Sequence, residues 1–300
     1  IKATGIGQHN FFGRRHGFSF NGFAGAITCF SRQGQEVALE QGKGDGLVGA
    51  IKGWQIFRHS FNLVITNLDQ ALRLSLVLYL VQSAYTVYSF YNPPQTMDVE
   101  GTQVPMMSPD TILPTVVLGL LAVIASLWIA VAWHRYALTG ETTSGWLPQF
   151  HGSAVMGYLG RSILIGVLVV LGVMVLSIPV GIISIGLPSL AGIMSLILIG
   201  VAAYLFFRLG IMLPAAAMDD KLTLGSAWDA TKGQSSTILI LSLIVVGASV
   251  VVQLPSWLND DPTSVVNVVY SLVVNWFATM IGISVLTTLY GHFVENRPID

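Results

Sequence analysis

The chain has 300 residues, of which 53% are hydrophobic and only 10% are charged, and its net charge is −1. A soluble globular domain carries about 25% charged residues, so the composition excludes that class and predicts a membrane protein. The single cysteine, Cys29, excludes an internal disulfide framework and any cysteine-rich metal site.

The first fifty residues differ from the remainder of the chain. They contain eleven glycines and six phenylalanines without a sustained apolar period, and the first methionine, Met97, comes much later. We therefore expect an N-terminal extension over 1–50 that is disordered or non-native, a membrane domain over 51–297 and a short tail over 298–300.

Lys and Arg are absent from three long stretches, 74–134, 162–207 and 233–296. A basic residue at the centre of a membrane helix costs roughly 2.5–3.5 kcal/mol, and one span needs about 20 apolar residues, so each stretch holds two spans. The predicted fold is an all-α, polytopic integral membrane protein whose six transmembrane helices form three hairpins. The spans are expected at 71–90, 114–133, 162–184, 189–207, 236–254 and 266–289.

The charges outside the spans predict the orientation. All fourteen Lys and Arg residues fall on one side, whereas the loops on the other side, 91–113 and 255–265, contain five acids and no base. Because basic flanks stay in the cytoplasm, both termini are predicted to be cytoplasmic and the protein to lie in the bacterial inner membrane. Helices in the core of a large soluble protein are the alternative, which this charge segregation opposes.

Three short amphipathic stretches, 56–67, 152–160 and 225–233, precede pairs of spans on the basic side. The Gly-Ser-Ala sequence and the closing glycine of the second stretch recur 73 residues later in the third, and Ser60 and Asn67 repeat the Ser-to-Gly spacing of seven. Gly and Asn readily end a helix in the left-handed conformation. The pattern predicts a threefold unit of an interfacial helix, a stop and two spans, with chance similarity as the alternative.

No group of residues predicts catalysis, a cofactor or a metal ion. The segment His292-Phe293-Val294-Glu295 lacks the second histidine of a zinc-protease helix, and no Gly-x-Ser-x-Gly sequence offers a serine nucleophile. No Asp, Glu or Lys lies deep in a predicted span, where proton-coupled transporters place an ionisable group. We therefore expect a protein that is not an enzyme.

Basic residues at the inner ends of the spans form the candidate interface site. His134 and Arg135 end the second span, Arg208 ends the fourth, and Lys232 precedes the fifth. Such residues anchor helices and complement helix dipoles. The sharper hypothesis is a basic ring that binds lipid phosphates.

Two amides lie near the middle of the membrane, Gln82 in the first span and Asn275 in the sixth. Because an amide in hydrocarbon needs a partner, we expect this pair to form an interhelical hydrogen bond, and a solute path is the alternative. In the second span, Ala122, Ser126 and Ala130 have the spacing of close helix packing rather than of a pore.

Two segments carry a resemblance to a known bacterial group: Trp133-His134-Arg135-Tyr136 with Gly140-Glu141, and Arg208 to Gly233 with Leu213-Pro214, Ala227 and Lys232 inside it. Over about residues 51–297, ending in Leu286 to His292, the chain resembles the membrane domain associated with glycerophosphoryl diester phosphodiesterases and the YciC-like uncharacterised inner-membrane proteins. In phosphodiesterases of this family, catalysis resides in a separate soluble barrel downstream of the membrane part. The resemblance implies an envelope role in lipid metabolism and transfers no catalytic residue.

We therefore expect a non-enzymatic inner-membrane protein of the bacterial envelope, a lipid-associated scaffold or an accessory membrane domain. Its expected partners are membrane lipids and a soluble or membrane-bound envelope enzyme, and no nucleic acid. The rival hypothesis is a transporter or flippase of an amphiphilic solute without its own proton-coupling site. The sequence leaves the oligomeric state open.

Overall fold

The structure, a computed structural model, describes residues 46, 48–93, 95–99, 102–258 and 264–299. The chain divides into two units, Ile1–Asp45 and Gly46–Asp300, and all described residues belong to the second. Most of the expected extension over 1–50, with Cys29, lies outside the described residues. So do Glu100, Asp260, Asp261 and the last residue of the tail.

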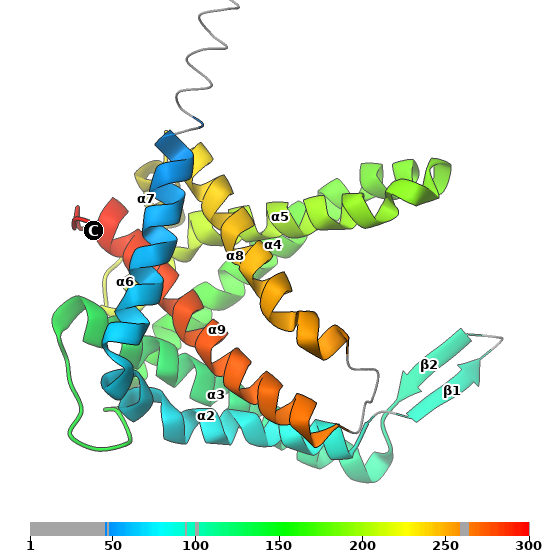
Figure 1. Cartoon of the computed structure of the whole chain (residues 1–300). Helices are drawn as coiled ribbons and strands as arrows, with labels where there is room; N and C mark the ends of the chain where they lie inside the picture. Colours follow the sequence, from blue (N-terminus) through cyan, green and yellow to red (C-terminus); the bar gives the residue numbers. More distant parts are fainter. Residues whose placement is uncertain (1–45, 47, 94, 100–101, 259–263, 300) are drawn as a thin grey trace, which may run out of the picture. The chain divides into compact units, whose positions relative to one another are not determined.

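The second unit is an all-α, polytopic membrane protein (Figure 1). Five segments are long and apolar enough to cross a membrane, and a helix pair bent by 80°, Val48–Thr66 with α2 (Leu68–Tyr91), passes the same test together and gives a sixth. The other spans are α3 (Pro109–Thr139), α4 (Gly152–Gly186), α5 (Ala191–Gly210) continued by α6 (Met212–Ala217), α8 (Ser235–Trp257) and α9 (Val265–Phe293).

Five predicted spans fall within one of these helices and the remaining one, at 189–207, begins two residues before α5, but several helices are longer than predicted. With 35 residues, α4 is about 52 Å long at 1.5 Å per residue, whereas the hydrocarbon core is about 30 Å thick. The helix must therefore tilt or extend beyond the hydrocarbon. We call the end where α3 and α5 finish and α8 begins, with Arg135, Arg161 and Arg208, the basic end.

The predicted helix stops before the spans are only partly present. Gly233 has a φ of +79° and separates the short α7 (Leu224–Ala230) from α8, as expected. In contrast, α4 runs unbroken through Gly160, so the prediction of a separate helix over 152–160 was wrong. Asn67 does mark a break, but its φ is −115°, outside the left-handed region. Its side chain makes the break by donating to the Leu63 carbonyl and accepting from the Tyr136 hydroxyl.

The helix Val48–Thr66 has three faces, which fit a position at a membrane surface. Ile56 and Val64 are fully buried against the bundle. Trp54 and Ile51 are 53% and 52% exposed, while the third face carries polar residues such as Lys52. An interfacial helix needs one apolar face for lipid and one polar face for water. This helix therefore matches the interfacial helix that was predicted before the first pair of spans.

A short β-hairpin, which the sequence analysis did not predict, connects α2 to α3. Strand β1 (Gln95–Val99) pairs antiparallel with β2 (Thr102–Met106), from Gln95 opposite Met106 to Val99 opposite Thr102. We call this end of the bundle the hairpin end. The link over 188–190 between α4 and α5 is a single 3-10 turn.

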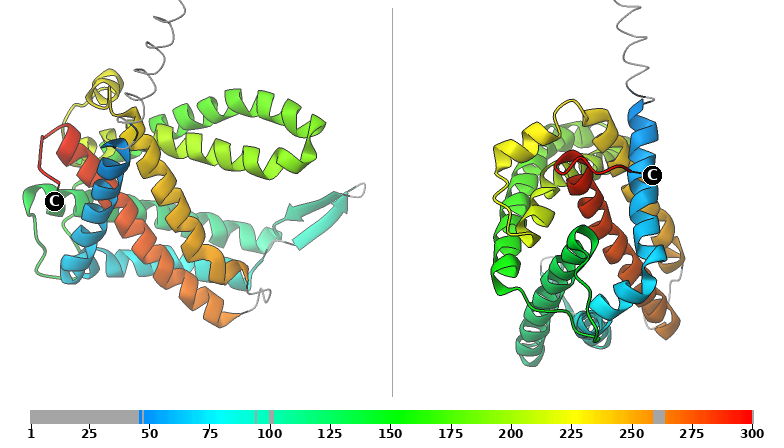
Figure 2. Two further views of the ribbon diagram at one scale, coloured as in Figure 1. Left: turned by 45° about the horizontal axis from the view of Figure 1, so that its top comes forward. Right: turned by 90° about the vertical axis from the view of Figure 1, so that its left-hand side faces the viewer.

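The core of the bundle lies toward the basic end, around α9. This helix contacts α2, α3, α6 and α8 and occupies the middle of the right-hand view in Figure 2. Its buried residues run from Trp276 to Gly291, and those of α3 run from Ala125 to Leu138. The outer halves of α4 and α5 instead expose apolar side chains such as Ile185, 84% exposed, as lipid-facing helices do.

Candidate functional site

A buried polar network joins four helices at the basic end. The ring of His134 lies between α9 and α4, with Nδ1 2.8 Å from the Thr287 hydroxyl and Nε2 3.4 Å from the Tyr158 hydroxyl. The Ser60 hydroxyl donates to the Thr288 hydroxyl over 2.9 Å. His134 is 0% exposed, so the structure places it inside the bundle, where it connects helices, and not at the lipid surface.

Two tryptophan indoles also hold α9 in place. Trp133 in α3 donates to the Ser284 hydroxyl over 2.7 Å, and Trp276 in α9 donates to the Ser75 hydroxyl over 2.8 Å. All of these partners are buried. Neutral interhelical hydrogen bonds of this kind average about 0.6 kcal/mol in membranes, so together they fix the register of α9 against α2 and α3.

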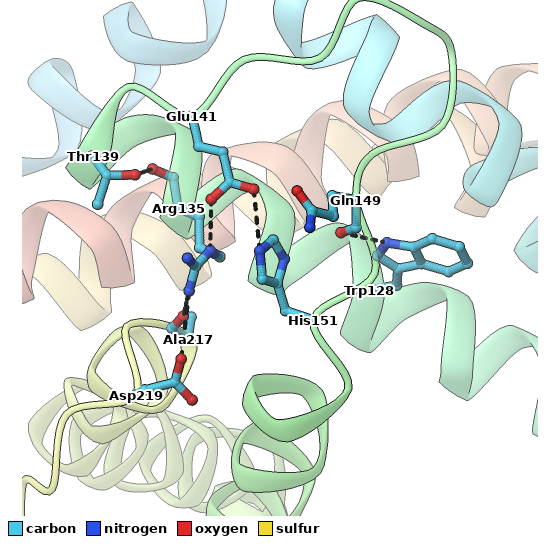
Figure 3. Close-up of polar contacts among 8 residues, drawn as sticks. All are labelled: Trp128, Arg135, Thr139, Glu141, Gln149, His151, Ala217 and Asp219. Carbon is cyan, nitrogen blue, oxygen red and sulfur yellow. Dashed lines mark hydrogen bonds and ion pairs between the residues drawn. The ribbon is translucent and has the colours of Figure 1, made fainter.

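Arg135 is bound on several sides by its own chain (Figure 3). Its Nε donates to the Glu141 carboxylate over 2.8 Å, and its Nη1 donates to the Ala217 carbonyl over 3.0 Å and lies 3.6 Å from the Asp219 carboxylate. Glu141 also contacts His151, Nε2 to Oε1, at 3.4 Å. Two carboxylates therefore compensate the charge of Arg135, which weakens the expectation that it binds a lipid phosphate.

Backbone geometry brings these carboxylates to Arg135. Gly140 has a φ of +75° and ends α3, so that the chain reverses and Glu141 faces the last turn of the helix. Asp219 follows α6 with a φ of +56°. Asp tolerates this left-handed conformation better than most residues because its short side chain can bond locally.

The segment 140–151 then lies along α3, as Figure 3 shows for Trp128 and Gln149. The Trp128 indole donates to the Gln149 carbonyl over 3.4 Å, and the Phe150 ring packs edge-on at 4.9 Å from Trp128. Trp146 covers the Arg73 guanidinium at 5.6 Å. Trp146 and Phe150 are each 52% exposed, and exposed aromatic rings are favoured at membrane–water interfaces.

Arg208 has a different environment, because no carboxylate within 4 Å compensates it among the described residues. The side chain is only 6% exposed, and its guanidinium carbon lies 3.8 Å above the Trp228 ring. Its Nη1 donates to the Tyr204 hydroxyl and, over 3.2 Å, to the hydroxyl of Ser235. Its Nε has no partner in the described part of the chain.

Ser235 is the first residue of α8, so Arg208 lies at the positive end of a helix dipole. Lys232, which is exposed, lies in the turn that connects Trp228 to Ser235. Three sources of positive potential, a guanidinium, a helix N-terminus and a nearby ammonium group, thus occupy one region. A buried cation costs several kcal/mol unless an anion accompanies it, so this region favours an anion more than Arg135 does.

The two mid-membrane amides line one cavity of about 400 Å³ between α2 and α9. The structure shows no hydrogen bond between Gln82 and Asn275, and Gln82 Oε1 and Ser83 Oγ have no partner within the described residues. The two amides thus line the same cavity, whereas the predicted hydrogen bond between them is not formed.

Two apolar cavities, of about 690 and 790 Å³, lie beside α3 and between α4, α5 and α9. They share Tyr158, Thr279 and Ile283. Ala122, Ser126 and Ala130 line the first of them, although Ala130 is itself buried in the bundle.

No group of three or more His, Cys, Asp or Glu side chains in the described residues has the arrangement of a metal site. Comparisons with models of protein families, with curated proteins and with solved structures gave no match. The resemblance to phosphodiesterase membrane domains therefore remains a prediction.

The sequence identified Arg208 and the amide pair but missed their surroundings. Trp228 and Ser235, which enclose Arg208, come from segments 20 or more residues away, and no local pattern connects them. Arg161 was also missed: it donates to the carbonyls of Met212 and Asp220 and so connects α4 to α6 and to the turn that follows α6. Its position directly after Gly160, between the predicted interfacial stretch and the third predicted span, was the only available signal.

Proposed function

We propose that this chain is a non-enzymatic, lipid-associated membrane protein that holds an anionic lipid at its basic end and acts as a scaffold or accessory membrane domain for an envelope enzyme. The observation that carries the proposal is Arg208, a buried guanidinium without a carboxylate partner among the described residues, stacked on Trp228 beside the start of α8. A phosphate group of a lipid would supply the missing negative charge.

The apolar cavities beside α3 and α4 support the same proposal. Their lining side chains are almost entirely hydrocarbon, and they lie in the membrane-spanning part of the bundle, where acyl chains can enter from the side. Both spaces are open to the surroundings of the helices, so an acyl chain that fills them gains dispersion contacts with the protein.

We further propose that the protein lies in the bacterial inner membrane with both termini in the cytoplasm. This orientation rests on the charge distribution of the sequence, in which all bases flank the spans on one side. It places the basic end, with Arg208, at the cytoplasmic surface, where the anionic head groups of the inner leaflet attract basic segments.

A transporter or flippase of an amphiphilic solute is the second candidate. The cavity that contains Gln82 and Asn275 favours it, since polar atoms without partners at membrane depth are typical of a path for a polar group. No Asp, Glu or Lys lies beside these amides in the lining of that cavity. Transport would therefore depend on a partner or on a gradient of the solute itself.

The proposal predicts that Arg208→Gln releases bound anionic phospholipid. One basic charge near an anionic membrane contributes about 1 kcal/mol, or about fivefold in affinity. We expect at least that loss in the amount of anionic lipid that remains with the purified protein, measured by lipid mass spectrometry after identical detergent washing.

Lys221→Gln is the matched control, because Lys221 is an exposed base at the same end with no ion pair among the described residues. It makes the same change in net charge and should keep the anionic lipid. Equal retention by wild type and Arg208→Gln, with both proteins monodisperse, would overturn the proposed lipid site.

A further inference from the structure

The cavity between α2 and α9 has the composition of a binding site for a small polar group. Gln82 Oε1 is buried without a hydrogen-bond partner, and the hydroxyl of Ser83, a residue only 7% exposed, has no partner that meets hydrogen-bond geometry, although it lies close to the Tyr79 side chain. Asn275 and Thr279 of α9 line the same space. An unpaired acceptor and an unpaired hydroxyl are costly in hydrocarbon, so a ligand that satisfies both would be bound favourably.

The chemistry of the lining excludes a charged ligand. Tyr79 is the only lining residue with an ionisable side chain, and its hydroxyl is already used, since it donates to the Leu272 carbonyl over 2.6 Å. A charged head group would be buried here without a counter-ion, which membrane interiors strongly disfavour. A neutral group that both donates and accepts, such as a hydroxyl, fits the unpaired atoms.

The depth of the cavity also excludes a large head group. Gln82 precedes the end of α2 by nine residues and Asn275 follows the start of α9 by ten, or about 14–15 Å along each helix. Since half of the hydrocarbon core is about 15 Å thick, the polar group would lie well below the head groups at the hairpin end.

Thr279 connects this polar cavity to hydrocarbon-lined space. The same residue lines the two apolar cavities of about 690 and 790 Å³. A polar group at Gln82 can therefore be continuous with apolar chains that extend past Thr279 toward Tyr158 and Ile283.

We propose that the cavity binds the free hydroxyl of an uncharged lipid. The hydroxyl donates to Gln82 Oε1 and accepts from Ser83, and the hydrocarbon chains occupy the apolar cavities beyond Thr279. The site is separate from the anion site at Arg208, and neither depends on the other. Diacylglycerols and long-chain alcohols share this chemistry.

The test is photo-crosslinking of the full chain in nanodiscs of zwitterionic phospholipid, with a diazirine-bearing diacylglycerol as the probe. Labelling should saturate and should map to the segments around 79–86 and 275–283. Unlabelled diacylglycerol or a long-chain alcohol should compete, and the stronger competitor identifies the class. Triacylglycerol, which lacks the hydroxyl, should not compete. Competition by triacylglycerol equal to that by diacylglycerol would overturn the proposal.

Two variants test the hydrogen bonds. Gln82→Leu should lower probe affinity at least about fivefold, the factor expected for one hydrogen bond of about 1 kcal/mol, and Ser83→Ala should lower it without disturbing packing. Gln253→Leu is the matched control, because Gln253 is an exposed amide of α8 that lines none of these cavities. Unchanged labelling in both Gln82→Leu and Ser83→Ala would also overturn the proposal, whatever the behaviour of Arg208→Gln.

Discussion

Arg135 and Arg208 both lie near the end of a membrane helix, yet their neighbours give them different roles. Arg135 contacts Glu141, Asp219 and a backbone carbonyl, so its positive charge is neutralised by groups of its own chain. Arg208 has an aromatic ring and hydroxyl groups around it but no carboxylate among the described residues. The same residue type is therefore a structural link in one place and a candidate anion ligand in the other.

This difference predicts that Arg135 matters for stability. Arg135→Gln should lower the free energy of unfolding by about 1–2 kcal/mol, because it leaves the partly buried Glu141 carboxylate and the exposed Asp219 carboxylate without their cation. Thermal unfolding of the purified protein in detergent measures the loss, and anionic lipid should remain bound.

The control is Arg73→Gln, which removes the exposed pair with Asp69, four residues earlier on the same helix. Such surface pairs contribute about 0.5 kcal/mol or less. Adding Glu141→Gln to Arg135→Gln should restore part of the stability, since it removes one of the stranded charges. Equal losses in the Arg135 and Arg73 variants would contradict the structural role.

Among the elements, the helix Val48–Thr66 depends on two glycines for its place on the bundle. A Cβ atom at Gly49 would lie 2.5 Å from the Ser236 hydroxyl, and one at Gly53 would lie 3.1 Å from the Thr237 carbonyl and 3.2 Å from the Leu241 amide. Small residues at a spacing of four let two helices approach closely. The start of this helix thus packs directly on the backbone of α8.

We expect Gly53→Leu to destabilise the domain by about 1–3 kcal/mol, because the larger side chain has to push the helix away from α8. Gly157→Leu in α4 is the control: no atom lies within 4 Å of its Cβ position, and both changes gain similar helix propensity. Thermal unfolding of the two variants compares them directly. A Gly53 variant as stable as the Gly157 variant would show that the two helices do not touch there.

At the scale of the whole molecule, the bend of 80° between Val48–Thr66 and α2 decides the number of spans. If α2 crosses the membrane, six spans place both ends of the domain on one side. If the bent pair is re-entrant, five spans separate them. The packing of α2 on α3, to which it is connected by the β-hairpin, supports a full crossing.

Cysteine labelling tests this in a Cys29→Ser background. Single cysteines at Asn62, Met107 and Thr223, all at exposed positions, should react differently with an impermeant maleimide on intact spheroplasts. Six spans with cytoplasmic termini predict labelling at Met107 alone, and labelling of all three after lysis. Matching behaviour of Asn62 and Met107 would mean that α2 does not cross.

How far the sequence determined this protein depends on the range of the forces concerned. Charge segregation and hydropathy are local properties, and each helix partitions into the bilayer according to its own composition. The spans, the all-α class and the Gly233 stop could therefore be predicted from the sequence. The unbroken passage of α4 through Gly160 did not, because a glycine in a membrane helix keeps its backbone hydrogen bonds when no water competes for them.

Only the tertiary structure shows which polar residues lack a counter-ion or a hydrogen-bond partner. Asp219 and Trp228 reach their arginines only because α6 packs on α3 and α7 packs on α5. Gln82 and Asn275 share a cavity because α2 packs on α9, and the register of these two helices leaves room between the amides instead of a hydrogen bond. Whether a charge has a counter-ion, or an amide has a hydrogen-bond partner, depends on side chains that are distant in the sequence. For that reason the candidate sites could be recognised only in the tertiary structure.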